Sequence, residues 1–415
     1  MTSPLSSIGT LYLCYFGLRE PLVQTQVLPY LRELARGGAR VTLLTFEPSL
    51  EESWTPEQIA DETARLARDG VRWERLAYHK RPSVPATLYD IAAGARFAAR
   101  EVRRGRANVL HARAHVPMAM ALVARTLERA RVVFDIRGLM ADEYADAGVW
   151  REGSLPFRLV KALERAGARR ADQIVVLTRR MRDFLVSERL AAPEKIEVIP
   201  CCVDFARYDN DAADSDDADD SPASRFEVVY AGSAVGLYLI EEMGRFFAEV
   251  REREPRAMFR VLTKSPAEEV SARLRAVGLA PEDFWVGAAR ADEVPRFLAR
   301  ARLGISFRKP TFSQIAASPT KIPEYLAAGL PVVSNTGIGD TDELLERERV
   351  GVLVGAFTKD ALADAAVRAL ARAREADVAA RCRSAARIHF DLGGVGGEAY
   401  RRVYRRLAAS LPASR

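Results

Sequence analysis

Lys321 and Glu324 lie three residues apart in the segment S-P-T-K-I-P-E-Y-L-A-A-G-L-P-V-V-S-N, residues 318–335. In a helix this spacing places a cation and a carboxylate on the same face. With the N–H groups that the first turn of a helix leaves unpaired, they are suited to binding a nucleotide. The N–H groups and Lys321 would hold the phosphates, and Glu324 would bind the ribose hydroxyls. The alternative is an ordinary capped helix that carries a Lys321–Glu324 ion pair on its surface.

The elements that would position these two side chains are a helix and the buried strand that follows it. Ser318 suits the N-cap of the helix, and Pro319 suits its first position, where the missing N–H has no partner to lose. Gly329 suits the end of the helix, and residues 331–334 predict the strand. Ser318, Pro319 and Thr320 are therefore predicted to lie beside Lys321 in a phosphate site.

This segment resembles the donor-nucleotide motif of retaining glycosyltransferases of family 4, which have the GT-B fold. That family usually carries two glutamates eight positions apart. Glu324 matches the second glutamate, but Ala316 stands at the position of the first. The form S-P-T-K-x-x-E-Y-L-A-A-G-x-P-V-V is similar to a bacterial branch of the family, so we interpret Ala316 as a variant of the motif. Ala316 has no carboxylate, so it cannot perform the role that is usually given to the first glutamate.

Strand-like runs alternate with helical runs through both halves of the chain, which predicts an α/β protein with two doubly wound parallel sheets. The resemblance implies the GT-B fold, in which two Rossmann-like domains face each other across a cleft. Residues 1–206 are predicted as the acceptor-side domain and residues 225–387 as the nucleotide-sugar donor domain. Residues 388–415 are expected to pack back on the first domain. Residues 207–224 contain seven aspartates and predict an acidic disordered linker.

Fourteen elements follow from the apolar patterning. One helix is predicted over Gln24–Arg36. The predicted strands are Thr10–Tyr15, Arg40–Phe46, Val71–Tyr78, Asn108–His111, Arg131–Ile136, Gln173–Thr178, Ile196–Pro200, Glu227–Ala231, Met258–Thr263, Phe284–Gly287, Leu303–Phe307, Pro331–Ser334 and Val350–Val354.

Composition excludes several classes of protein. An apolar content of 48% and a charged content of 28% indicate a folded, soluble protein, and no apolar run is long enough to span a membrane. The net charge of +6 favours anionic substrates or an anionic membrane surface, whereas no basic cluster with interleaved aromatics indicates nucleic-acid binding. The spacing of the four cysteines fits neither a metal site nor a disulfide framework, so we expect reduced, buried thiols.

Further donor-side residues follow other predicted strands of the second half. Gly232 and Ser233 would let backbone N–H groups approach a phosphate. Lys264 and Arg308 are cations at strand ends, where open α/β folds bind ligands. They could replace the basic residue that family members often have after Gly232 and that A-V-G-L-Y lacks. The alternative is that each is a solvated loop charge.

In the first half, His111, Arg113 and His115 lie at or just after a predicted strand end. The family commonly has an H-x-H-like pattern here, in which His111 matches the first histidine and Arg113 replaces the second. Either histidine could instead be packed in the core. The pattern R-G-x-x-x-D-E suggests an acceptor- or sugar-binding loop, or a surface salt bridge, and the first loop is a usual place for such contacts. The predicted acceptor residues are Arg19, Gln24, His115, Asp135, Arg137 and Glu143.

The resemblance implies a hexosyltransferase-type glycosyltransferase that moves a sugar from a nucleotide-sugar donor, expected to be UDP-linked, with retention of configuration. The acceptor would be a saccharide or a lipid-linked molecule in surface polysaccharide or glycolipid biosynthesis. No cofactor or metal is expected, because side chains would neutralise the diphosphate. The expected location is the cytoplasm, with peripheral contact to the inner membrane. The alternatives are a nucleotide-sugar epimerase or hydrolase, and an inactive nucleotide-binding relative. The predicted catalytic residues are His111, Arg113, Lys264, Arg308 and Lys321.

Overall fold

The computed structural model describes residues 5–208 and 225–411. Most of the predicted acidic linker, residues 209–224, lies outside the described residues. By their internal contacts the residues form two compact units. The first unit comprises Met1–Ala145, Trp150–Pro200 and Leu392–Arg415, and the second comprises Asp146–Val149 and Cys201–Asp391.

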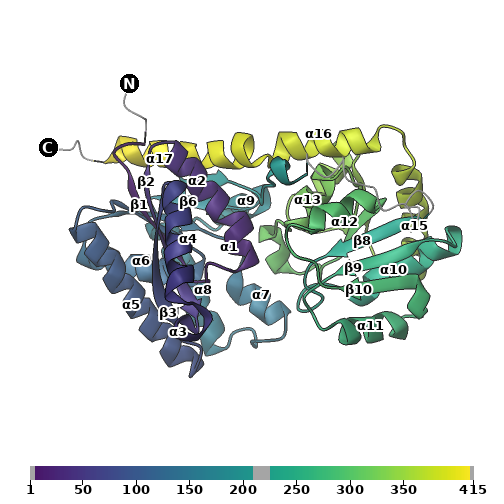
Figure 1. Cartoon of the computed structure of the whole chain (residues 1–415), viewed down its shortest axis with the longest axis horizontal. Coiled ribbons are helices and arrows are strands. Elements are labelled where there is room, and N and C mark those ends of the chain that lie inside the picture. The colour runs from purple at the N-terminus through teal and green to yellow at the C-terminus, as the bar shows by residue number, and fades with distance from the viewer. Residues whose placement is uncertain (1–4, 209–224, 412–415) are drawn as a thin grey trace. The chain divides into compact units, whose positions relative to one another are not determined.

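The first unit is built on a seven-stranded, fully parallel sheet with the order β3-β2-β1-β4-β5-β6-β7. Helices connect successive strands, as parallel pairing requires. From β1, the strands β2 and β3 are added on one side and the strands β4 to β7 on the other, which is the arrangement of a doubly wound sheet (Figure 1). Its strands are β1 (Gly9–Cys14), β2 (Arg40–Pro48), β3 (Val71–Tyr78), β4 (Val109–Arg113), β5 (Arg131–Asp135), β6 (Gln173–Val176) and β7 (Ile196–Val198).

The helices of this unit include one break that the sequence analysis missed. A single helix was predicted over Gln24–Arg36, but the structure has two, α1 (Pro21–Gln26) and α2 (Leu28–Arg36), separated at Val27. Pro29 explains the break, because it has no N–H to continue the first helix. The remaining helices are α3 (Leu50–Ser53), α4 (Pro56–Arg68), α5 (Ser83–Arg103), α6 (His115–Leu127), α7 (Met140–Asp146), α8 (Leu155–Arg170), α9 (Arg179–Ser187), η1 (Pro193–Lys195), η6 (Leu392–Gly397) and α17 (Glu398–Ser410).

The second unit repeats this architecture with a six-stranded parallel sheet of order β10-β9-β8-β11-β12-β13. Its strands are β8 (Glu227–Ala231), β9 (Met258–Leu262), β10 (Phe284–Gly287), β11 (Leu303–Ser306), β12 (Val332–Asn335) and β13 (Gly351–Val354). Its helices are η2 (Phe205–Arg207), α10 (Ile240–Arg253), α11 (Ala267–Ala276), η4 (Pro281–Asp283), α12 (Val294–Arg300), η5 (Phe312–Ala316), α13 (Lys321–Ala327), α14 (Thr341–Arg347), α15 (Lys359–Ala373) and α16 (Val378–Phe390).

The end of the chain returns to the first unit. The predicted boundary at residues 387–388 falls inside α16, and the segment assigned to the first unit begins at Leu392. There the glycine-rich η6 forms a π-helical turn that leads into α17. Helix α17 packs against α2 and β7 of the first sheet.

All thirteen predicted strands are present, with ends that differ by no more than two residues. Helices cover both faces of each sheet, so the central strands are buried, and their aliphatic residues form the cores. The four cysteines are buried and reduced, as predicted. Among the described residues, no helix is long and apolar enough to cross a membrane.

Candidate functional site

Two buried cations meet at the carboxyl edge of the second sheet. Arg308 follows β11 and is 9% exposed, and Lys321, the first residue of α13, is 3% exposed. Both lie against the ring of Tyr238, with Lys321 Nζ 4.0 Å and the Arg308 guanidinium carbon 4.6 Å from its centre. Among the described residues, no carboxylate lies within ion-pair distance of either cation. Buried charges are normally paired, so this arrangement is built for an anion.

The local sequence explains why Lys321 turns inward. Tyr325, one turn further along α13, is fully buried, and its hydroxyl accepts a hydrogen bond from Ala231 N at 2.8 Å. This contact fastens α13 to the end of β8. Gly232 follows with a φ of +148°, and a Cβ atom there would lie 3.0 Å from Lys321 Nζ. The glycine thus leaves room for the lysine, and Lys321 does not form the surface ion pair with Glu324 that was the alternative interpretation.

Arg308 is held by residues that the sequence analysis did not assign. Its Nε donates to Gln314 Oε1 at 2.6 Å, and its backbone N–H donates to Asn335 Oδ1 at 2.8 Å. Gln314 is itself buried and donates to Ser313 Oγ. Gln314 lies in η5, and Asn335 is the last residue of β12. A buried amide that follows a serine is not a distinctive sequence signal, so only the structure identifies these two residues as supports of Arg308.

Tyr238 is the other residue that the sequence analysis missed. It lies in A-V-G-L-Y, the loop in which the family's basic residue is absent, and its backbone forms an antiparallel bridge with Arg308. Burial alone would raise the pKa of the Tyr238 phenol, but the charges of Lys321 and Arg308 outweigh burial and lower that pKa. Burial lowers the pKa of the Lys321 ammonium, and Tyr238 opposes this effect. The Tyr238 phenol therefore partly offsets the positive charge of Lys321 and Arg308.

Glu324 lies on the same helix but faces different partners. Its Oε1 lies 3.7 Å from Arg207 Nη1, and the side chain is 21% exposed. Burial raises the pKa of the Glu324 carboxyl, and the charges of Arg207 and Lys321 partly offset this rise. Glu324 therefore offers a hydrogen-bond acceptor beside the cation pair rather than a partner that neutralises it.

The helix start differs from the prediction. Helix α13 begins at Lys321 and has seven residues, so Ser318 is not its N-cap. Ser318 Oγ instead accepts a hydrogen bond from Cys201 N at 3.1 Å. Thr320 occupies the N-cap position without a side-chain capping bond, and Pro319 is buried in the preceding turn. The candidate site is therefore formed mainly by side chains rather than by a capped helix end.

The remaining donor-side residues are more exposed. Ser233 is exposed, and its carbonyl oxygen accepts a hydrogen bond from the Tyr230 hydroxyl. Lys264 is exposed at the end of β9 and makes no ion pair among the described residues. Ala316, which replaces the family's first glutamate, is buried in η5.

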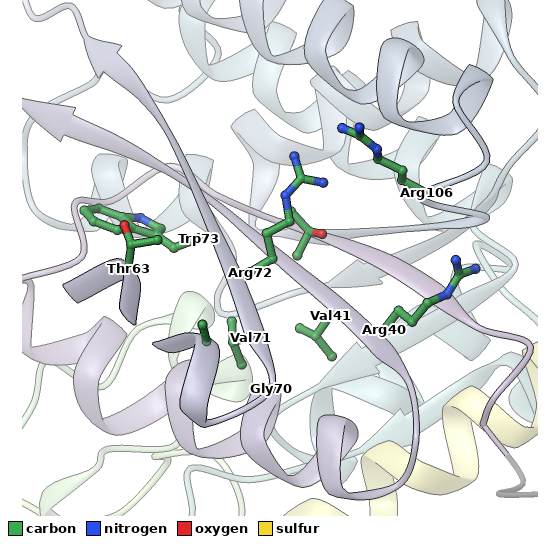
Figure 2. Close-up of a pocket in the computed structure, with 10 residues that line it drawn as sticks. Arg40, Val41, Thr63, Gly70, Val71, Arg72, Trp73 and Arg106 are labelled. Atoms are coloured by element: carbon green, nitrogen blue, oxygen red, sulfur yellow. The ribbon is translucent and has the colours of Figure 1, made fainter. Parts of the chain in front are cut away.

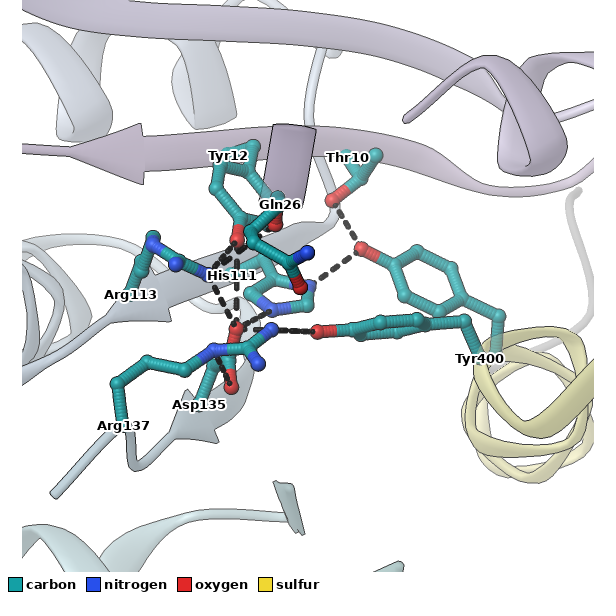
Figure 3. A network of polar contacts seen from close by, with 9 residues as sticks. Thr10, Tyr12, Gln26, His111, Arg113, Asp135, Arg137 and Tyr400 are labelled. Carbon is teal, nitrogen blue, oxygen red and sulfur yellow. Dashed lines mark hydrogen bonds and ion pairs between the residues drawn. The ribbon is translucent and has the colours of Figure 1, made fainter. Parts of the chain in front are cut away.

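In the first unit, the predicted residues His111, Arg113, Asp135 and Arg137 form one buried polar network (Figure 3). Asp135 is at its centre: Arg137 Nε lies 2.8 Å from one carboxylate oxygen, and His111 Nε2 and Arg113 Nη1 each lie 3.6 Å from the other. The hydroxyl of Tyr400 donates to the same oxygen at 3.0 Å. These side chains come from β4, the end of β5 and helix α17.

This network fastens α17 to the sheet. His111 Nδ1 lies 2.9 Å from the hydroxyl of Tyr404, which also lies 2.9 Å from Thr10 Oγ1. Burial lowers the pKa of His111, which keeps the imidazole neutral. Burial would raise the pKa of Asp135, but Arg137, His111 and Arg113 outweigh it and lower that pKa. His111 and Asp135 are 0% exposed, so the structure gives them packing partners rather than an open face.

The other predicted acceptor residues are separate from this network. His115 is buried against Glu164 at 3.2 Å, while Glu143 and Gln24 are half-buried. Arg19 is exposed, stacks on Trp54 and donates to Gln58 Oε1. Glu143 explains part of the R-G-x-x-x-D-E pattern, because a Cβ atom on Gly138 would collide with its carboxylate.

A cavity of about 570 Å³ lies elsewhere, at the amino ends of β2 and β3 (Figure 2). Arg40, Arg72 and Arg106 lie along it, but Arg72 and Arg106 already pair with the buried carboxylate of Glu101. Open parallel sheets bind ligands at the opposite, carboxyl edge. Among the described residues, no cluster of side chains is suited to a metal ion.

Comparisons with known proteins agree with this architecture. Residues 23–202 match the model of the glycosyl transferase 4-like domain, and residues 228–372 match that of glycosyl transferases group 1. No curated protein matches the sequence significantly. The chain is a glycosyltransferase of the GT-B type.

Solved structures show the same fold at low sequence identity. Sucrose-phosphate synthase from Thermosynechococcus elongatus is 16% identical, with a TM-score of 0.72 over 97% of this chain and 100% of that chain. Anabaena Alr3699/HepE in complex with UDP and glucose is 15% identical, with a TM-score of 0.68 over 95% and 99%. A glycosyltransferase from Rickettsia africae is 13% identical, with a TM-score of 0.66 over 96% and 98%.

Proposed function

We propose that this chain is a retaining, family 4 glycosyltransferase that uses a UDP-linked hexose as donor. The observation that carries the proposal is the pair of buried cations, Lys321 and Arg308, which has no carboxylate partner among the described residues. A nucleoside diphosphate supplies the missing negative charge. The complex of a similarly folded protein with UDP supports this class of ligand.

In the proposed reaction, the bond between the anomeric carbon and the diphosphate oxygen breaks. A bond from that carbon to an acceptor hydroxyl forms on the same face of the sugar, and the hydroxyl proton leaves with the diphosphate. Negative charge grows on the departing diphosphate, and Lys321 and Arg308 would stabilise it more strongly in the transition state than in the ground state. Each charged hydrogen bond contributes about 1.5–3 kcal/mol, a part of the barrier reduction that enzymes achieve.

Glu324 would bind the ribose hydroxyls, and Gly232, Ser233, Ser318, Pro319 and Thr320 would line the phosphates. Lys264 would approach the diphosphate as an exposed cation. We place the acceptor on the first unit, where Arg19, Gln24 and Glu143 are accessible after strands β1 and β5. His111, Arg113, His115, Asp135 and Arg137 would act there by fixing the shape of the sheet edge and of α17 rather than by direct contact.

We propose that the acceptor is a saccharide or a lipid-linked saccharide of a surface polysaccharide or glycolipid, and that the enzyme works in the cytoplasm without a metal ion. Two side-chain cations take the place that Mg²⁺ fills in other diphosphate sites. The test of metal independence is activity after exhaustive chelation. A complete loss that Mg²⁺ or Mn²⁺ restores would contradict it.

The decisive experiment is calorimetric titration with UDP, GDP, ADP and CMP, followed by incubation of the selected nucleotide sugar with and without saccharide acceptors. We expect selective binding of UDP, and sugar transfer only when an acceptor is present. NMR of the product should show that the anomeric configuration of the donor is retained. Turnover at full rate without any acceptor would indicate the epimerase or hydrolase alternative. Binding without turnover of any donor would indicate an inactive relative.

A further inference from the structure

Three neighbouring helices of the first unit, α5, α6 and α8, share an outer face with an unusual distribution of charge. Glycines bring them together: a Cβ atom on Gly94 of α5 would lie 2.5 Å from Met120 of α6, and one on Gly167 of α8 would lie 3.0 Å from Met118. Arg125 of α6 also donates to the carbonyl oxygen of Arg170 at 2.6 Å. The three helices therefore form one layer (Figure 1).

None of the three helices exposes a carboxylate. Their acidic residues are Asp90, Glu101 and Glu164, and each is at most 1% exposed. Asp90 contacts His79 and Tyr15, Glu101 contacts arginines, and Glu164 contacts His115 and Lys161. The whole chain has 56 acidic residues, but in these helices of 21, 13 and 16 residues every carboxylate is buried.

The same helices expose basic residues. Among the arginines on their outer surface, Arg96, Arg158 and Arg165 are exposed and make no ion pair within the described residues. Lys80 and Arg81, also exposed, immediately precede α5. A face that carries unpaired cations and no carboxylate has a positive potential and attracts anionic surfaces.

The face is also apolar. Seven of the 16 large hydrophobic side chains that are exposed among the described residues lie on these three helices, with exposed fractions between 45% and 69%. They are Val84, Leu88, Tyr89, Val123, Leu127, Leu155 and Leu159. Single exposed apolar residues are ordinary, but a concentration on one layer marks an interaction surface.

We propose that the outer face of α5, α6 and α8 is a docking surface for an anionic lipid bilayer. Leucine and valine side chains would enter the boundary between headgroups and acyl chains, while the arginines contact lipid phosphates. A soluble polyanion would use the arginines but leave the leucines without partners. A second copy of the same face would bring like charges together. The surface does not depend on transferase activity, so it can be tested separately from the proposed function.

The test is co-flotation of the full chain with vesicles of phosphatidylcholine alone and of phosphatidylcholine with 30% phosphatidylglycerol. We expect binding to the anionic vesicles, weakened by raising the salt concentration because charge contributes. The double variant Leu88→Glu/Leu159→Glu should bind at least about tenfold more weakly, because it removes apolar contacts and adds repulsion. Arg96→Ser/Arg165→Ser should weaken binding by about tenfold or more, since each surface arginine contributes a severalfold change.

The matched control is Val367→Glu/Ile388→Glu, which places the same charges at exposed apolar positions of α15 and α16. This variant should float like the wild type. Circular dichroism and thermal melting confirm that each variant is folded. Wild-type protein that stays with neither vesicle, or that floats equally well after both surface double substitutions, would overturn the proposal. So would a dimer in solution that the Leu→Glu pair dissociates, because the face would then bind a second copy.

Discussion

Lys321 Nζ lies 4.0 Å from the centre of the Tyr238 ring. Arg308 contacts the same ring at 4.6 Å. The same phenol therefore contacts both cations, and their charges lower its pKa despite its burial.

Removing either cation should weaken diphosphate binding. For Lys321→Ala we expect UDP affinity to fall between about tenfold and a hundredfold, since a charged hydrogen bond contributes about 1.5–3 kcal/mol. Arg308→Ala should have a comparable effect. Calorimetry measures both. The control is Lys359→Ala, an exposed lysine at the start of α15, which should bind UDP normally. Equal affinity of Lys321→Ala and wild type would mean that this lysine only packs against the tyrosines.

The Tyr238 phenol should ionise at a lower pH than an ordinary tyrosine, because Lys321 and Arg308 lower its pKa despite burial. When tyrosinate absorbance is followed as the pH is raised, one tyrosine should ionise at a lower pH than the others. Tyr238→Phe should remove this first step of the titration. Bound UDP adds negative charge and should shift this titration to higher pH. UDP affinity should also fall as pH rises through this range, because the lowered pKa of Lys321 brings its deprotonation closer. An unchanged titration curve in Tyr238→Phe would contradict the assignment.

Glu324 should recognise the ribose and not the phosphates. Glu324→Ala should weaken UDP binding by about tenfold to a hundredfold, the effect of one charged hydrogen bond. Inorganic pyrophosphate, which has no ribose, should bind the variant at least as well as the wild type. If both ligands lose affinity equally, Glu324 supports the cation pair instead of the nucleoside.

The strands could be predicted because both faces of a parallel sheet are buried, which leaves continuous apolar runs such as Val228–Val229. Lys321 and Arg308 could be predicted as candidate site residues, because Arg308 follows β11 and the sequence motif places Lys321 at the start of the helix between β11 and β12, at the carboxyl edge of a parallel sheet. The contacts of Tyr238 and Gln314 could not, because they depend on side-chain packing across loops. His111 shows the opposite limit: a histidine at a predicted strand end suggests chemistry, but it lies within β4, and its contact with the buried hydroxyl of Tyr404 identifies a packing role.

Helix α17 should be held to the first sheet largely by its tyrosine hydroxyls. Tyr404→Phe removes a buried hydroxyl that contacts both His111 and Thr10, and should lower the free energy of unfolding by about 1–3 kcal/mol because two polar groups lose a partner. Chemical denaturation of the full chain measures the change. Tyr144→Phe, at an exposed tyrosine, is the control and should alter stability by less than about 0.5 kcal/mol. Equal effects of both substitutions on the free energy of unfolding would contradict the prediction that the Tyr404 hydroxyl anchors α17.

The buried network also predicts how stability depends on pH. In the unfolded chain His111 gains a proton near its ordinary pKa of about 6.5, whereas burial lowers its pKa in the folded protein. The unfolded state therefore binds more protons below this pH, and the free energy of unfolding should fall by up to about 1.4 kcal/mol per pH unit between pH 6 and 5. Asp135 does not contribute in this window, because its folded pKa is lowered and its unfolded pKa lies near 4. His111→Gln should be less stable at pH 7 but show a shallower decline toward pH 5. A slope that His111→Gln leaves unchanged would show that other groups set the acid sensitivity.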